Sequence, residues 1–356
     1  MYKLFRPIFF LWQPERIHDL VLSVMKWMER IPLTGRFIRL LYNYKHPSLE
    51  REVFGIKFLN PVGLAAGFDK DGDGYNAISN FGFGFVEIGT LTPKPQEGNP
   101  KPRCFRLPKD HAIINRMGIN NKGIRHAVSF IQKHRPRVPL GCSIINGKDT
   151  PTSEAYKDYE FCFEYIYDYI DYFVLNLSCP NVKDAGKLQT MENLSPIIDK
   201  LLELRLMYDD YRPILIKISP DIDKAHLDEI IDMVLISGLD GIIATNTTTS
   251  RQNLKSNEGT IREIGRGGMS GAPLYQRSLE MVKYIYQKTE GHLPIIASGG
   301  IMTPQQALEM LDNGASLIEV YSGFIYNGPK YIKKINKFLA KTFVAREKEN
   351  SSTAIQ

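Results

Sequence analysis

The sequence predicts an α/β fold, a (β/α)8 TIM barrel with a small N-terminal helical hairpin. Eight short apolar runs follow residue 60, and helical patterns lie between several of them. The chain has 356 residues, which suffices for one barrel and an appendage. The competing fold is a doubly wound sheet. It requires a GxGxxG turn after its first strand, but residues 65–70 read AAGFDK.

Composition excludes several classes of protein. Hydrophobic residues make up 43% and charged residues 24%, as in ordinary folded proteins, so neither wholesale disorder nor a polytopic membrane protein is expected. The four cysteines form no CxxC pair and no Cys/His spacing, so we expect no metal site and a reducing compartment. The N-terminal apolar run, residues 8–12, is too short for a signal peptide.

Residues 1–46 differ from the rest of the chain and are expected to form a separate segment. Apolar residues at helical spacing predict a helix from Pro14 to Glu29, and a second short helix is expected from Phe37 to Tyr44, with Pro32 and Gly35 breaking the chain between them. This hairpin could simply pack on the main domain. Aromatic residues set among basic ones also fit a contact with a membrane surface.

The main domain is expected to span residues 47–345, followed by a polar tail over 346–356. The expected strands are 62–66, 85–89, 138–145, 172–177, 214–218, 241–245, 294–297 and 317–320. The expected helices include 153–170, 193–208, 224–237, 273–289 and 304–313. Two connections, 91–137 and 250–268, are too long for plain turns, and long loops in a compact domain are usually functional.

In this fold the active site lies at the carboxyl ends of the strands. Those ends carry lysines, asparagines, hydroxyl groups and glycines, with no carboxylate pair of the glycosidase type. The last two strands end in SGG (298–300) and YSG (321–323), so bare backbone amides stand at the usual phosphate position. These groups suit a planar, polar, anionic ligand.

Three side chains near strand ends are interpreted as functional rather than structural. Cys179 stands in a loop among asparagines, NLSCPN over 176–181, where a thiolate could act as a general base. Cys142 and Cys162 lie in apolar runs and are interpreted as structural. Lys70 and Lys217 each follow an apolar run, and beside a phosphate site they are expected to meet ligand anions or a reduced flavin ring.

These segments together resemble the dihydroorotate dehydrogenase family. The resemblance covers about residues 1–340 and rests on eight segments in order: 63–72 (GLAAGFDKDG), 89–92 (GTLT), 115–121 (NRMGINN), 176–181 (NLSCPN), 217–221 (KISPD), 244–248 (ATNTT), 268–271 (GMSG) and 321–323 (YSG). The hairpin and the 115–121 segment resemble the membrane-associated, quinone-reducing class 2 enzymes.

The resemblance implies FMN as cofactor and assigns residues to it. The FMN contacts fall on Ala66, Gly67, Lys70, Thr90, Ser143, Asn176, Lys217, Thr245, Gly271, Gly300, Tyr321 and Ser322. The substrate contacts fall on Lys70, Asn115, Arg116, Met117, Gly118, Ile119, Asn181, Asn246 and Thr247. The path of a membrane quinone, between the N-terminal helices, is expected at His18, Arg103 and Tyr321.

The implied reaction oxidises dihydroorotate to orotate in pyrimidine biosynthesis, with Cys179 as the base and Lys217 stabilising the reduced flavin. Two positions depart from the family pattern. Class 2 enzymes usually carry a serine base, and cysteine is typical of soluble class 1 enzymes, which lack the hairpin. Ser143 stands where a flavin-contacting asparagine is usual, and either Ser143 or Asn146 could reach the ring.

Two alternatives remain open at this point: a class 1 enzyme using a soluble acceptor such as fumarate, and a non-catalytic flavin- or phosphate-binding barrel. The charge distribution favours a membrane partner. Residues 1–46 and 330–356 each carry a net charge of +5, which leaves −4 for the remainder. A basic, aromatic hairpin suits an anionic lipid surface rather than nucleic acid. The cytoplasmic side of a bacterial inner membrane is expected, since no Arg/Ser-rich transit peptide is present.

Overall fold

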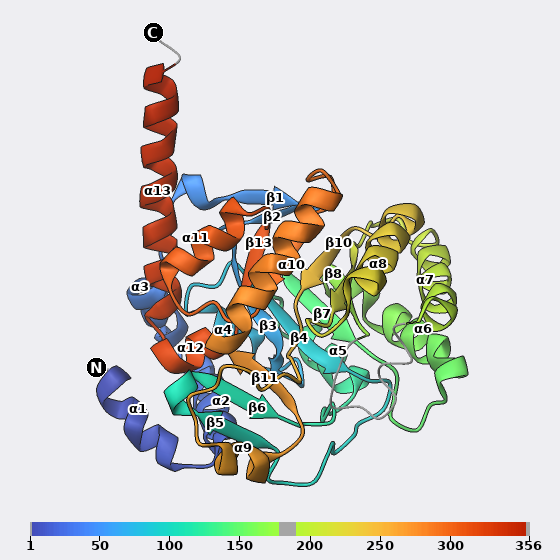
Figure 1. Cartoon of the computed structure of the whole chain (residues 1–356), viewed down its shortest axis with the longest axis horizontal. Coiled ribbons are helices and arrows are strands. Elements are labelled where there is room, and N and C mark those ends of the chain that lie inside the picture. The colour runs from blue at the N-terminus through green and yellow to red at the C-terminus, as the bar shows by residue number, and fades with distance from the viewer. Residues whose placement is uncertain (1, 178–189, 354–356) are drawn as a thin grey trace.

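The computed structural model describes residues 2–177 and 190–353, and it confirms the predicted barrel. Eight parallel strands close in the order β10-β12-β13-β3-β4-β7-β8-β9 (Figure 1). Their apolar runs are buried on both faces, as expected when helices cover a parallel sheet. The strands are β3 (Val62–Asp69), β4 (Phe85–Leu91), β7 (Leu140–Ile144), β8 (Tyr172–Asn176), β9 (Ile214–Ile218), β10 (Gly241–Ala244), β12 (Ile295–Ser298) and β13 (Leu317–Val320).

Helices follow the strands and form the outer layer of the barrel. Local signals set their ends: Asp223 caps the start of α8, and Thr303 with Gln306 forms a capping box on α11. The helices of this layer are α4 (Tyr75–Ser79), α5 (Ile124–Ile131), α6 (Ala155–Ile166), α7 (Met191–Arg205), α8 (Lys224–Ser237), α10 (Tyr275–Lys288), α11 (Pro304–Asp312), α12 (Ser322–Asn327) and α13 (Tyr331–Thr353).

The chain end differs from the expected polar tail. Residues 346–353 continue α13, which projects beyond the barrel in Figure 1. Arg346 forms an ion pair with Asp312 of α11 at 2.6 Å, and the segment AREKEN is composed largely of good helix formers. The helix therefore continues for about two turns beyond the packed core.

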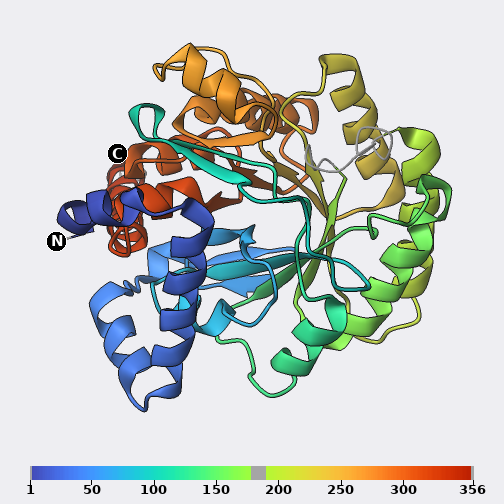
Figure 2. The ribbon, with the colours of Figure 1, turned by 90° about the horizontal axis from the view of Figure 1, so that it is seen from below.

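The N-terminal segment contains three helices rather than two: α1 (Tyr2–Leu11), α2 (Pro14–Arg30) and α3 (Thr34–Tyr42). The turn between α2 and α3 is shorter than expected, because Gly35 lies within α3 and only Ile31, Pro32 and Leu33 lie between the helices. Figure 2 shows the three helices together on one side of the barrel. Ion pairs attach them: Lys26 to Asp73 at 2.8 Å, and Arg103 to Glu15 at 2.7 Å.

The two long connections are partly folded, which the apolar pattern did not predict. They contribute the strands β5 (Cys104–Leu107), β6 (Ala112–Asn115) and β11 (Gly268–Gly271) and the short helix α9 (Glu258–Ile264). The three strands form an antiparallel sheet in the order β11-β6-β5. Its members come from segments about 150 residues apart, so only the closed barrel brings them together.

Side chains inside the barrel form layers. The lower layer is apolar and includes Phe85, Tyr172, Leu215 and Leu317. Phe58 of the hairpin β1 (Arg51–Val53) and β2 (Ile56–Phe58) joins this layer and closes that end of the barrel. The layer above is charged, because Glu87, Lys217 and Glu319 each lie two residues further along their strands and point the same way.

Gly63 tests the packing of the lower layer. A Cβ at this position would lie 2.2 Å from the ring of Phe85, and both residues belong to barrel strands that cannot shift independently. We expect Gly63→Ala to lower the free energy of unfolding by about 1–3 kcal/mol through overpacking. Urea denaturation followed by circular dichroism measures this loss.

Gly147→Ala is the matched control, since a Cβ there would meet no atom closer than 3.4 Å. The control is expected to unfold at the wild-type urea concentration. Equal stability of the two variants would show that the barrel interior accommodates the extra methyl group.

Candidate active site

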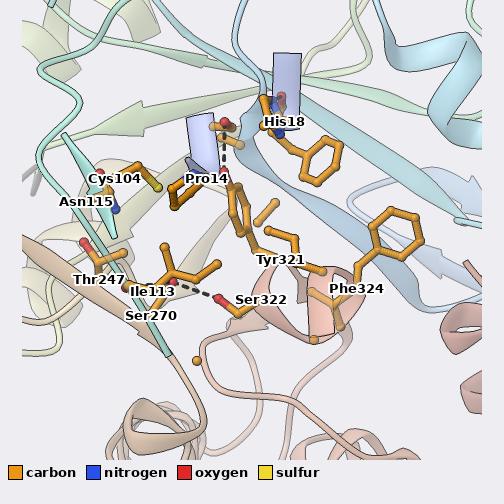
Figure 3. A pocket seen from close by; sticks show the side chains of 18 of the residues that line it. Pro14, His18, Cys104, Ile113, Asn115, Thr247, Ser270, Tyr321, Ser322 and Phe324 are labelled. Atoms are coloured by element: carbon orange, nitrogen blue, oxygen red, sulfur yellow. Dashed lines mark hydrogen bonds between the residues drawn. The ribbon is translucent and has the colours of Figure 1, made fainter. Parts of the chain in front are cut away.

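A cavity of about 490 Å³ opens at the carboxyl ends of the barrel strands. Its floor is formed by the strand ends, one wall by the β5-β6-β11 sheet, and its roof by α1 and α2. In Figure 3, Tyr321 stands at the centre, between Pro14 and His18 of α2 and Ser322 at the start of α12. The Tyr321 hydroxyl donates a hydrogen bond to the Gly67 carbonyl at 3.3 Å.

Most of the site residues predicted from the sequence line this one cavity. They come from seven of the eight barrel strands or the loops that follow them, from the β6 loop and from α2. The lining includes Ala66, Gly67, Lys70, Thr90, Asn176, Lys217, Thr245, Gly271, Gly300, Tyr321 and Ser322 of the expected cofactor set, Asn115, Met117, Gly118, Ile119, Asn246 and Thr247 of the expected substrate set, and His18.

The remaining predicted residues lie elsewhere. The Arg116 guanidinium binds the backbone carbonyl of Arg266 at 3.1 Å and stacks over the ring of Phe105, outside the cavity lining. Arg103 does not line the cavity itself, but it forms an ion pair with Glu15, which does. Cys179 and Asn181 lie outside the described residues.

A row of polar side chains crosses the floor of the cavity. The Asn246 side-chain amide Nδ2 donates to the side-chain oxygen Oδ1 of Asn176 at 3.2 Å. The Asn176 Nδ2 in turn donates to the Thr90 hydroxyl at 2.8 Å. Thr90 is 2.9 Å from the hydroxyl of Ser143, which is fully buried behind it. The row fixes the orientation of both amides. Neither Ser143 nor Asn146 belongs to the lining.

Glycines bring backbone close together at the end of the site formed by β12 and β13. A Cβ on Gly300 would lie 2.3 Å from the Tyr275 nitrogen, and one on Gly271 would lie 2.2 Å from the His111 carbonyl. Both glycines have positive φ, 71° and 105°. Side chains are excluded there, so Gly271 and Gly300 line the cavity with backbone alone. Nearby, Ser270 and Ser322 are hydrogen-bonded at 2.8 Å, as Figure 3 shows.

The two lysines of the site differ in their surroundings. Lys70 forms no hydrogen bond or ion pair with any residue in the described part of the chain, and burial lowers its pKa. Lys217 is held by Glu319 at 3.1 Å and Glu87 at 3.3 Å. Burial alone would lower the pKa of Lys217, but the two carboxyl groups outweigh it and raise the pKa. Both lysines offer a cation to an anionic ligand.

The roof of the cavity is apolar and holds a neutral imidazole. His18 Nε2 is 2.9 Å from the Phe68 carbonyl oxygen, and the His18 ring meets the Phe68 ring edge to face. Phe68 also contacts Tyr321 and Phe324, so aromatic rings connect α2 to the β13 end. Burial and the nearby Lys70 lower the pKa of His18 to about 3.

Many lining residues were not singled out from the sequence, and Glu319, Asn120 and Cys104 are three polar or reactive examples. Glu319 interrupts the apolar run LIEV, and a charge within a buried strand is a signal that could have revealed it. Asn120 lies within the 115–121 segment, and its side-chain oxygen is buried without a hydrogen-bond partner in the described chain. Cys104 of β5 gives no local signal, because only the fold brings it to the site.

The fold and the cavity define a class. This is a (β/α)8 barrel with glycine amides at the ends of its seventh and eighth strands, the arrangement with which barrel enzymes hold phosphate groups. The sequence model of the family described as "Dihydroorotate dehydrogenase" matches residues 48–343. The chain therefore belongs to the dihydroorotate dehydrogenase family, which consists of flavin-dependent oxidoreductases.

Individual relatives agree with this assignment. "Dihydroorotate dehydrogenase (quinone)" of Christiangramia forsetii is 45% identical over 95% of this chain and 98% of its own. The protein of the same description from Mycobacterium tuberculosis is 40% identical over 96% and 94%. A crystal structure of the enzyme from Eimeria tenella in complex with ferulenol has a TM-score of 0.82 at 36% identity, covering 92% of this chain and 90% of that one.

His18 generates a prediction about acid stability. Its pKa in the folded state, about 3, lies below the ordinary value of 6.5, so the unfolded chain gains a proton below pH 6.5 that the native protein does not. The protein therefore loses stability as the pH falls. Between pH 7 and pH 5, we expect the free energy of unfolding of His18→Gln to fall by about 1–2 kcal/mol less than that of wild type, measured by chemical denaturation.

His292→Gln, which replaces an exposed imidazole, is the control and should keep the wild-type pH dependence. An unchanged pH dependence in His18→Gln would contradict the assignment of a neutral, buried His18.

Proposed function

We propose that this protein oxidises dihydroorotate to orotate in de novo pyrimidine biosynthesis and passes the electrons through FMN to a membrane quinone. The observation that carries the proposal is the shape of the cavity. A single space joins the apolar roof under α1 and α2 to the polar strand ends. Such a site lets one ring system meet a polar substrate on one side and an apolar acceptor on the other.

The residues present fit FMN. Glycine amides beside Gly271 and Gly300 suit its phosphate, and Lys70, which has no hydrogen-bond or ion-pair partner in the described chain, suits an anionic ligand. The residues that we propose hold it are the twelve assigned above by resemblance, with Ser143 acting from behind Thr90. When bound, FMN supplies the hydride acceptor for ring carbon six of dihydroorotate and an electron donor for the quinone.

The substrate is proposed to lie beside Asn115 and Asn246. The Asn246 side-chain oxygen is positioned by the Thr247 backbone amide at 2.8 Å, and its amide by Asn176. Lys70 would balance the carboxylate of dihydroorotate. Met117, Gly118 and Ile119 lie on the same side, while Asn181 and the base Cys179 belong to the segment outside the described residues.

The proposed proton transfer runs from ring carbon five of dihydroorotate to the Cys179 sulfur. A nearby cation favours the thiolate form that accepts this proton, and Lys70 supplies a cation to this cavity. Lys217, at the floor, holds positive charge where the reduced cofactor becomes negative. Glu87 and Glu319 keep Lys217 oriented between the two half-reactions.

The quinone is proposed to enter through the roof, past His18 and Tyr321, with Arg103 holding Glu15 at the entrance. Fourteen large apolar side chains between residues 4 and 41 are exposed, including Leu11 at 84% and Trp27 at 61%. In the described chain, no helix has both the length and the apolar character that crossing a bilayer requires. We therefore propose that residues 1–46 dock on an anionic membrane surface, on the cytoplasmic side of a bacterial inner membrane.

Two alternatives have less support. The curated relatives reported above are described as quinone enzymes, and none of these comparisons favours a class 1 enzyme that uses a soluble acceptor such as fumarate. The same relatives are described as dehydrogenases, which argues against a non-catalytic flavin-binding barrel. We assign residues 47–345 to the FMN barrel and residues 1–46 to quinone access.

Anaerobic reduction of the bound flavin tests the reaction. We expect a yellow protein whose visible absorbance is bleached by dihydroorotate. Cys179→Ala should remain yellow but reduce about 10²–10⁴-fold more slowly, because the general base is lost. Cys179→Ser should keep partial activity with a higher pH optimum, since a hydroxyl is the weaker acid. Stopped-flow absorbance gives the rates.

Cys162→Ala is the control, because this buried thiol of α6 lies outside the cavity lining. Reduction of Cys179→Ala at the wild-type rate would overturn the assignment of the base. A colourless protein that takes up no FMN would overturn the proposed function itself.

Exposed side chains of α2 test the membrane contact. We expect the triple variant Leu20→Gln/Val24→Gln/Trp27→Gln to lose binding to vesicles containing phosphatidylglycerol, because these side chains are 51%, 44% and 61% exposed and lie off the cavity. Co-sedimentation measures binding. Flavin reduction by dihydroorotate should persist while turnover with a membrane-embedded quinone falls.

The matched control is Leu206→Gln/Met207→Gln/Ile236→Gln, which removes exposed apolar side chains from α8 and from the two residues after α7. It should bind vesicles like wild type. Equal binding by the α2 variant and this control would show that the apolar face of α2 is not the membrane contact.

A further inference from the structure

Three buried charged groups meet beneath the cavity, and the mechanism above uses only one of them. The Lys217 ammonium of β9 lies 3.3 Å from Glu87 of β4 and 3.1 Å from Glu319 of β13. The side chains are 7%, 0% and 0% exposed, respectively. Two carboxylates beside one ammonium would leave a net charge of −1 in the barrel interior, where uncompensated charge is costly.

The hydrogen bonds of the two carboxyl groups are incomplete. Glu87 uses Oε1 and Glu319 uses Oε2 for Lys217, while Glu87 Oε2 and Glu319 Oε1 have no partner in the described part of the chain. Two carboxylates cannot bond to each other, since both only accept. A proton on one of them would turn that group into a donor and would satisfy the other.

The groups packed around the pair are neutral. The Tyr172 hydroxyl of β8 is buried without a partner in the described chain, and burial together with Glu87 and Glu319 raises its pKa well above the ordinary value. Burial and Glu87 likewise raise the pKa of Cys142, on β7. The pKa of Glu87 itself is raised well above its ordinary value by burial and by Glu319, even beside Lys217.

We propose that Glu87 and Glu319 share one proton, so that the pair carries a single negative charge, and that they hold Lys217 as a positioned cation under the flavin. The carboxyl pair and the lysine then sum to zero charge. This inference rests on the proposed function insofar as it places FMN above Lys217. Glu87 and Glu319 are positioning residues, because they act through Lys217.

The shared proton has a consequence for the flavin. With both carboxylates ionised, a net negative site would oppose the negative charge that the flavin gains on reduction. With one shared proton, Lys217 keeps its charge and its geometry, and the site carries no net negative charge that would oppose flavin reduction. Removing the second acid should then leave the flavin environment unchanged, whereas removing both should leave Lys217 unbalanced and favour the reduced flavin.

Infrared spectroscopy of the flavin-free protein tests the proton directly. We expect a protonated carboxyl C=O band at pH 8 that shifts when glutamate is labelled with ¹³C and that is lost in Glu319→Gln. Glutamate labelling separates it from Asp69, whose pKa burial raises to about 6 and which is ionised at pH 8. Absence of a glutamate band at pH 8 overturns the proposal, and this measurement on wild type needs neither a variant nor bound FMN.

Redox titration of the FMN-loaded protein tests the consequence. Glu319→Gln, which keeps the shape and a hydrogen-bond donor, should have the wild-type midpoint potential at pH 7. The double variant Glu87→Gln/Glu319→Gln should have a more positive potential. A positive shift in Glu319→Gln about half as large as in the double variant would show two ionised carboxylates and overturn the proposal. A protein that binds no FMN but shows the infrared band would refute the proposed function and leave the shared proton standing.

Discussion

Closure of the barrel is the constraint on which the site depends. The pairing of β13 with β3, through Val320 and Leu64, joins the last strand to the first. Because all eight strands run parallel, closure places their carboxyl ends on one rim. Side chains from Lys70 to Ser322 then face one cavity of about 490 Å³, although 250 residues separate them. Without closure, the lysines, amides and glycines would lie along an open sheet edge.

The barrel rim alone leaves the cavity open, and the N-terminal helices complete it. Their attachment is partly polar, through ion pairs such as Lys26 with Asp73 and Glu15 with Arg103. Their inner face is apolar and aromatic, and the Phe68 ring contacts both His18 and Tyr321. Their outer face keeps many large apolar side chains exposed. An isolated globular domain rarely exposes such a surface, which supports the proposed contact with lipid.

Electrostatics inside the barrel follow from the layered packing. An apolar layer closed by Phe58 lies below, and a charged layer lies above it, directly under the cavity. A lysine at this depth is stable only with a counter-charge, and Glu87 and Glu319 bring two carboxyl groups to it. The number of protons on this cluster therefore sets the charge that the cavity floor presents. The same burial keeps His18 neutral at the roof.

Local sequence patterns determined the barrel class, most strand positions and the lining residues that stand at strand ends. Ile214–Ile218 and Leu317–Val320 were predicted with the bounds observed, because a buried parallel strand is a nearly continuous apolar run with polar residues at its end. Resemblance then supplied the family. These patterns involve residues within a few positions of one another, and strand and helix propensities act over the same short range.

The tertiary structure alone decided which distant groups meet. The β5-β6-β11 sheet, the placement of Cys104 in the cavity wall and the outward direction of Arg116 depend on pairings across about 150 residues. The pairing of Lys217 with Glu87 and Glu319 joins three strands whose spacing in the chain carries no signal of contact. The extension of α13 through residues expected to form a tail combines local helix propensity with the ion pair of Arg346 with Asp312, a partner 34 residues away. Contacts of this kind come from barrel closure and packing, which no local pattern encodes.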